Sequence, residues 1–63
     1  MPYYKVTVVV GEYKDVLYTQ ETDKDMALRY AREIAKEYEE RFNKECVRTD
    51  AELIDENEFL RNT

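Results

Sequence analysis

The sequence contains no histidine, tryptophan or serine, and it has only one glycine and one cysteine. Without serine and histidine the chain cannot form a Ser-His-Asp triad or a Cys-His pair. The lone Gly11 excludes a P-loop and a dinucleotide fingerprint, because both use several glycines to bring backbone close to phosphate. Cys46 alone cannot form an intrachain disulfide or, without histidine, a four-ligand zinc site. We therefore expect a protein that is not an enzyme, with no catalytic residues, no metal site and no cofactor.

The chain is short and acidic. Its 63 residues predict a single small domain, and a chain of this size buries only about 60% of its unfolded surface, so that it needs a well-packed core or self-association. Fifteen acidic and ten basic residues give a net charge of −5, which argues against binding to nucleic acid or anionic membranes. Because no apolar run has the length of a membrane helix or the character of a signal peptide, we expect a cytoplasmic protein.

Alternating side chains predict two strands joined by a hairpin loop. Residues 3–10 are rich in β-forming residues, and their apolar face is expected in the core: Tyr4, Val6, Val8 and Val10. Gly11 to Asp15 is the expected loop, and Val16 to Gln20 the expected second strand. The pattern leaves open which side of the second strand faces inward, that of Leu17 and Thr19 or that of Val16, Tyr18 and Gln20.

A long amphipathic helix follows. Thr22 is its expected N-cap, with Asp25 in the capping-box position three residues later. Apolar side chains continue at helical spacing to Phe42 or Asn43. They form one stripe: Ala27, Tyr30, Ala31, Ile34, Ala35, Tyr38 and Phe42. The alanines in this stripe predict that the helix lies close to a sheet.

The segment after the helix allows two interpretations. Residues 47–54 alternate like a third strand, whereas Thr49 to Glu52 has the pattern of a capping box that would begin a second helix through Leu60. We predict the strand, because a two-stranded hairpin alone is marginally stable, followed by a short turn or helical piece around Phe59. Cys46 is expected to be a packing residue at the start of this strand.

The predicted fold is α+β with ββαβ order: a small, three-stranded, mainly antiparallel sheet with one amphipathic helix packed on one face. Its expected core consists of Val6, Val8, Val10, Leu17, Ala31, Ile34, Tyr38, Phe42 and Leu53. One helix covers one face of the sheet, and an exposed face with apolar and tyrosine side chains is typical of an interaction site. The expected interface residues are Tyr3, Lys5, Thr7, Val9 and Tyr18. A homodimer is the simplest assembly, and pairing through an open strand edge is a second version of it.

Acidic residues concentrate near the C-terminus. Residues 1–44 carry eight basic and nine acidic side chains, whereas residues 45–63 carry two and six. Five carboxylates form the expected acidic patch: Asp50, Glu52, Asp55, Glu56 and Glu58. Such a patch can steer a basic partner or mimic nucleic acid, or it can be a solvated segment that keeps a small protein in solution. The carboxylates lack the spacing and the glycine of a calcium loop.

Together these features predict a small, non-enzymatic protein–protein interaction module. We expect a homodimer that acts as an adaptor or inhibitor by binding a host or partner protein, without direct contact to nucleic acid or membrane. The alternative is an acidic nucleic-acid mimic, a decoy that occupies a nucleic-acid-binding protein. A third hypothesis, an enzyme whose site forms between chains, has only the carboxylates and tyrosines in its favour. In size and in its lack of a catalytic signature the chain resembles the small accessory proteins of phages and mobile elements, many of which bind host factors.

Overall fold

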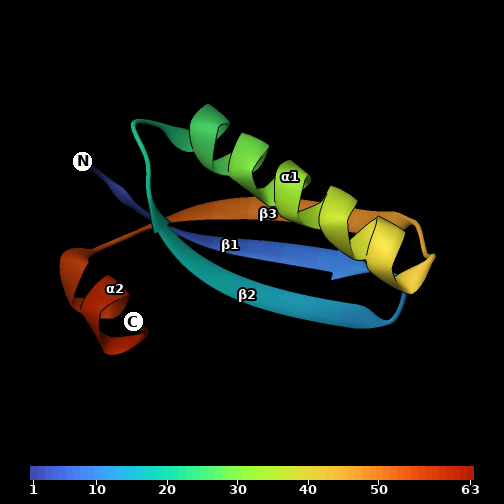
Figure 1. Cartoon of the computed structure of the whole chain (residues 1–63). Helices are drawn as coiled ribbons and strands as arrows, with labels where there is room; N and C mark the ends of the chain where they lie inside the picture. Colours follow the sequence, from blue (N-terminus) through green and yellow to red (C-terminus); the bar gives the residue numbers. More distant parts are fainter.

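A computed structural model describes residues 1–63. Its elements are β1 (Tyr3–Val10), β2 (Tyr13–Gln20), α1 (Lys24–Phe42), β3 (Cys46–Ile54) and α2 (Glu56–Arg61). The strands form one antiparallel sheet in the order β2-β1-β3. The long helix α1 lies on one face of this sheet, and the short helix α2 lies at one end of the other face (Figure 1). This architecture is the predicted ββαβ, α+β fold.

The hairpin between β1 and β2 is tighter than the sequence predicts. Val10 pairs directly with Tyr13, so only Gly11 and Glu12 form the turn. Gly11 has a φ of 59°, and Glu12 lies outside the positive-φ region. This combination is typical of a type II′ turn, whose twist matches that of the flanking strands. The expected loop from Gly11 to Asp15 is therefore wrong, because β2 begins at Tyr13 rather than at Val16.

The first turn of α1 also differs from the prediction. The side chain of Asp23, not that of Thr22, is the N-cap, and its Oδ1 accepts a 2.9 Å hydrogen bond from the Met26 N–H. An aspartate caps as well as a threonine and adds negative charge at the positive end of the helix dipole. The end of the helix is as predicted: Phe42 is its last residue, and Asn43 is a left-handed C-cap with a φ of 53°.

The third strand is confirmed, and the competing second helix from Thr49 is wrong. Thr49 and its neighbours pair with β1, and the helical piece around Phe59 is α2. As predicted, Cys46 opens the strand and packs, half-buried, against the core. Neither helix of the structure is long and apolar enough to cross a membrane.

The core lies between α1 and the sheet and consists mainly of valine and alanine. Its buried side chains are Tyr4, Val6, Val8, Val10, Ala27, Ala31, Ala35 and Ala51. Because alanine side chains are small, α1 lies close to β1 and β3, and it lies over these two strands rather than over β2 (Figure 1). On the side of β2 the core is completed by larger, half-buried side chains: Leu17, Tyr30, Ile34 and Tyr38.

Two predicted core residues lie at the surface instead. Phe42 is 37% exposed because it ends α1, where its ring lies beside those of Tyr13 and Tyr38. Leu53 is 66% exposed. It pairs with the buried Tyr4, but β3 is an edge strand and no further strand covers it.

Candidate protein-interaction face

The strand register assigns every sheet residue to one of two faces. The even-numbered residues of β1 are buried under α1, and Leu17 and Thr19 lie across from them, so this side of β2 faces inward. We call the opposite side the open face. It is formed by three rows of side chains: Tyr3, Lys5, Thr7 and Val9 from β1, Lys14, Val16, Tyr18 and Gln20 from β2, and Arg48, Asp50, Glu52 and Ile54 from β3.

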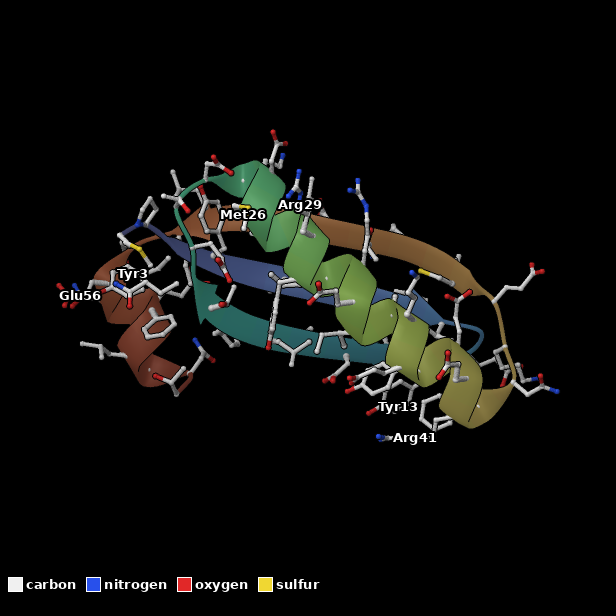
Figure 2. All side chains as sticks on the ribbon, turned by 45° about the horizontal axis from the view of Figure 1, so that its top comes forward. Tyr3, Tyr13, Met26, Arg29, Arg41 and Glu56 are labelled. Atoms are coloured by element: carbon white, nitrogen blue, oxygen red, sulfur yellow. The ribbon has the colours of Figure 1, made fainter.

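Helix α2 covers one end of the open face. The ring of Phe59 lies 4.5 Å from that of Tyr3, centroid to centroid, with the two planes tilted by 39°. Tyr3 accordingly lies beside α2 (Figure 2). The predicted interface residue Tyr3 is thus on the expected face, but its ring packs against the protein itself. The sequence pattern could place a helical piece near Phe59, but not the side of the sheet on which it lies.

The apolar side chains of the open face lie on β2 and at the hairpin end of β1, and charged side chains lie among them. Thr7 lies between Val16 and Asp50, and Tyr18 lies across Lys5 from Glu52. Lys5, Thr7 and Tyr18 are half-buried. Val16 is 37% exposed. Val16 was not among the predicted interface residues, although it lies on the same side of β2 as the predicted Tyr18.

Basic side chains dominate the end of the open face near the hairpin. Val9 lies between Lys14 of β2 and Arg48 of β3, and Lys5 lies further along the same strand. These basic side chains outnumber the acidic ones of Asp50 and Glu52 on a chain whose net charge is −5. The open face is therefore much less acidic than the protein as a whole. Lys14 and Arg48 were not among the predicted interface residues, and only the register brings them together.

The predicted acidic patch is divided between two elements. Asp50 and Glu52 lie on β3, where Glu52 is directly across from Lys5. The remaining three belong to the start of α2: Asp55 is its N-cap, with Oδ1 accepting a 2.8 Å hydrogen bond from the Glu58 N–H, and Glu56 lies in the first turn. These three carboxylates stabilise a helix N-terminus, where negative charge is favourable. No cluster of side chains suited to hold a metal ion is present.

A second cluster lies on the other side of the sheet, between the end of α1 and β2. The rings of Tyr13, Tyr38 and Phe42 lie 5.0–5.7 Å apart, and the Arg41 guanidinium lies 5.8 Å from the centre of the Tyr38 ring. Tyr13 and Arg41 accordingly lie at the same end of the molecule (Figure 2). The Tyr38 hydroxyl donates a 2.6 Å hydrogen bond to Asp15 Oδ2. This hydrogen bond, desolvation and the nearby negative charge raise the pKa of Tyr38 to about 12.

Comparison with protein-family models, curated proteins and solved structures gave no match to this chain.

Proposed function

We propose that the protein is a non-enzymatic protein–protein interaction module that works as a homodimer, and that its open face binds a partner protein as an adaptor or inhibitor. One observation carries this proposal: a whole side of the three-stranded sheet, which includes Val9, Val16 and Tyr18, is covered by α2 at one end only. An apolar strip with a polar rim on a small protein is typical of a docking surface.

The chemistry of the open face indicates the kind of partner. Val9, Val16 and Tyr18 offer apolar area, and tyrosine contributes contact area together with a polar tip. Lys14 and Arg48 flank Val9 on both sides. A complementary partner presents an apolar segment with acidic residues beside it, since opposite charges at the rim guide association and fix the orientation. The row Lys14–Val9–Arg48, which contains no acidic residue, makes the hairpin end of this face the part of an acidic protein best suited to such a partner.

The experiment uses the full chain as bait and compares two exposed substitutions of the same chemistry. Val16→Glu places a charge on the open face, midway along β2, whereas Met26→Glu places it on α1, away from that face. Both positions are similarly exposed, at 37% and 39%. We expect a captured protein to bind the wild type and Met26→Glu in a purified one-to-one titration, and to lose at least about tenfold in affinity with Val16→Glu.

Two outcomes contradict the proposal. In the first, the purified partner binds Val16→Glu and the wild type equally well. In the second, its binding is unaffected by Val16→Glu but is abolished when Glu56 and Glu58 of α2 are replaced by the neutral amides. That second pattern is the one that the nucleic-acid mimic predicts.

A further inference from the structure

The two edges of the sheet differ in how they are protected. On β2 the side chain of Asp15 occupies the edge, because its Oδ1 accepts a 2.9 Å hydrogen bond from the backbone N–H of Val16. On β3 the edge carries the two most exposed apolar side chains of the sheet, Val47 at 68% and Leu53 at 66%. Charges and bulges usually protect strand edges, and β3 has both, because Arg48, Asp50 and Glu52 are exposed and Val47 is the extra residue of a bulge. Unlike the edge of β2, however, the backbone of residues 47–54 accepts or donates no hydrogen bond to a side chain, so its outward-pointing groups are free to pair with another strand. The outward-pointing backbone groups of β3 are therefore available to a further strand.

The hydrogen-bond pattern identifies the backbone groups that point outward from β3. The two-residue turn is closed by Val10 and Tyr13, and the N–H of Glu21 bonds to the carbonyl of Pro2 at 3.1 Å at the other end of the same ladder. The even-numbered residues of β1 thus bond to β2, and its odd-numbered residues bond to β3. Their partners on β3 are Arg48, Asp50, Glu52 and Ile54. The intervening residues, Thr49, Ala51 and Leu53, direct their backbone N–H and C=O groups to the free edge.

We propose that the occupant is a second copy of this chain, and that two β3 strands pair antiparallel about a two-fold axis at Asp50. The two sheets of three strands would then form one continuous sheet. In this register Arg48 lies opposite Glu52 of the second copy. Val47 is the extra residue of a bulge, since Val9 pairs with Arg48 and Val10 with Cys46, and it lies beside Leu53 of the second copy. The two-fold axis repeats both pairs, so each exposed apolar side chain is covered and each charge faces its opposite.

In the neighbouring registers Leu53 does not face an apolar side chain of the second copy. A backbone group that points outward from β3 can bond only to an outward-pointing group of the second copy. The nearest other positions of the two-fold axis that meet this condition are Thr49 and Ala51. With the axis at Thr49, Arg48 faces Asp50 of the second copy twice, but Leu53 faces the charged Glu45, which precedes β3, and stays without an apolar partner. With the axis at Ala51, Asp50 faces Glu52 twice, and like charges directly across are destabilising. The register centred on Asp50 has one unfavourable pair, between the two copies of Asp50 itself.

The position of α1 agrees with this pairing. Strands lie about 4.8 Å apart and α1 lies over β1 and β3, so the two α1 helices would lie roughly 10 Å apart, the spacing of packed helices. Glu39 marks the flank of α1 nearest β3, because its Oε2 accepts a 3.0 Å hydrogen bond from the Cys46 N–H. Leu28 lies on the same flank about three turns earlier, close to the level of Asp50. The half-buried Leu28 would therefore meet its copy near the axis.

This pairing rests on the homodimer proposed above, but it leaves the open face free. It also joins two open faces side by side, with Glu52 between Lys5 of its own chain and Arg48 of the second copy. A dimer formed through β3 and a partner bound on the open face are therefore separate events. Val16→Glu should abolish partner binding and leave the dimer intact, whereas Leu53→Lys should break the dimer first.

Sedimentation equilibrium of the full chain tests the charge pairs. We expect Arg48→Glu to weaken the dimer at least about tenfold, since it turns two attractions into two repulsions, and Arg48→Glu/Glu52→Lys to restore most of that loss. We expect Asp50→Asn to tighten the dimer several-fold, because it removes the like charges at the axis. Circular dichroism confirms that each variant is folded. A wild type that stays monomeric up to millimolar concentration, or a dimer that ignores these substitutions, overturns the pairing.

Disulfide trapping tests the register itself. In a Cys46→Ser background, Asp50→Cys places two thiols at the axis in a non-hydrogen-bonded pair, where the Cα atoms are about 4.5 Å apart and a disulfide fits. We expect mild oxidation to link Asp50→Cys into a covalent dimer and to leave Thr49→Cys and Ala51→Cys as monomers. Efficient linking of Thr49→Cys or Ala51→Cys in place of Asp50→Cys would show a different register and refute the one proposed.

Discussion

The hydroxyl of Tyr38 in α1 lies 2.6 Å from Oδ2 of Asp15 in β2, and the other oxygen of that carboxylate accepts a hydrogen bond from the N–H of Val16. One aspartate thus ties the long helix to the strand that the helix covers least and, with the same side chain, occupies the edge of that strand. The two sheet edges therefore differ. The helix α1 lies over β3 but does not bond to the outward-pointing backbone groups of that strand, and it contacts β2 mainly through long side chains.

Removing the Tyr38 hydroxyl should therefore weaken the attachment of α1 to β2. We expect Tyr38→Phe to lower the free energy of unfolding by about 1 kcal/mol, a modest value because the bond is only partly buried and solvent screens it. Urea unfolding followed by circular dichroism measures the change. Tyr13→Phe is the matched control, since it removes a hydroxyl from the same aromatic cluster without breaking a hydrogen bond. Equal losses in the two variants would contradict a specific role for the Tyr38–Asp15 bond.

The same contact predicts a change in stability at alkaline pH. The folded state raises the pKa of Tyr38 from 10.0 to about 12, chiefly through the hydrogen bond to Asp15. Between these two values the folded chain keeps a proton that the unfolded chain releases, so the stabilisation is present below pH 10 and is lost as the pH rises toward 12. We expect the urea midpoint of the wild type to fall more steeply across this range than that of Tyr38→Phe. The absorbance of tyrosinate, compared between the two proteins, should show one group that titrates near the upper end. Parallel stability curves would contradict the assignment.

The hairpin turn provides a test of backbone conformation. Gly11 has a φ of 59°, and a Cβ at this position would lie 3.0–3.2 Å from three carbons of the Lys44 side chain. We expect Gly11→Ala to destabilise the fold by roughly 1–2 kcal/mol, mainly from the left-handed conformation. Glu12→Ala, in the same turn but outside the positive-φ region, should be nearly neutral. Combining Gly11→Ala with Lys44→Ala separates the two causes, because it removes the crowding and leaves the backbone strain.

Features set by local periodicity could be predicted from the sequence. Alternation identified the core face of β1, helical spacing identified the stripe of Ala27, Ala31 and Ala35, and the marginal stability of a lone hairpin favoured β3 over a helix. Errors arose where a choice depends on contacts distant in sequence. Leu53 continues the alternation of a core strand, yet it is exposed because its strand lies at the sheet edge.

The residues of the candidate site also fall into those that the sequence predicts and those that only the structure reveals. The β1 residues of the open face follow from alternation alone, whereas Lys14, Val16 and Arg48 join them only through the strand register. That register depends on the turn having two residues rather than five, and the sequence pattern does not distinguish these lengths. The contact of Phe59 with Tyr3 is likewise a matter of tertiary packing, because either face of the sheet could accept a short helix.

The N-cap of α1 allows a direct comparison between the predicted and the observed residue. Asp23 accepts the hydrogen bond from Met26, and Thr22 has no such contact. We therefore expect Asp23→Ala to cost about 1 kcal/mol of unfolding free energy and Thr22→Ala to have little effect. Both residues are exposed, so neither change disturbs the core. The reverse order of the two losses in urea unfolding would show that the helix begins at the residue that the sequence pattern favours.

The attachment of α2 depends on one aromatic contact. A helix of six residues is too short to be stable alone, and α2 contains no buried residue, so the packing of Phe59 on Tyr3 is its main attachment to the sheet. We expect Phe59→Ala to release α2 while the sheet and α1 remain folded. Amide hydrogen exchange measures this directly: the α2 amides should lose their protection, and those of β1 should keep most of theirs. Leu60→Ala, at a neighbouring position that is 61% exposed, should leave the protection of α2 unchanged. If Phe59→Ala unfolds the whole chain instead, α2 is part of the cooperative core, and the sheet does not stay folded without this helix on the open face.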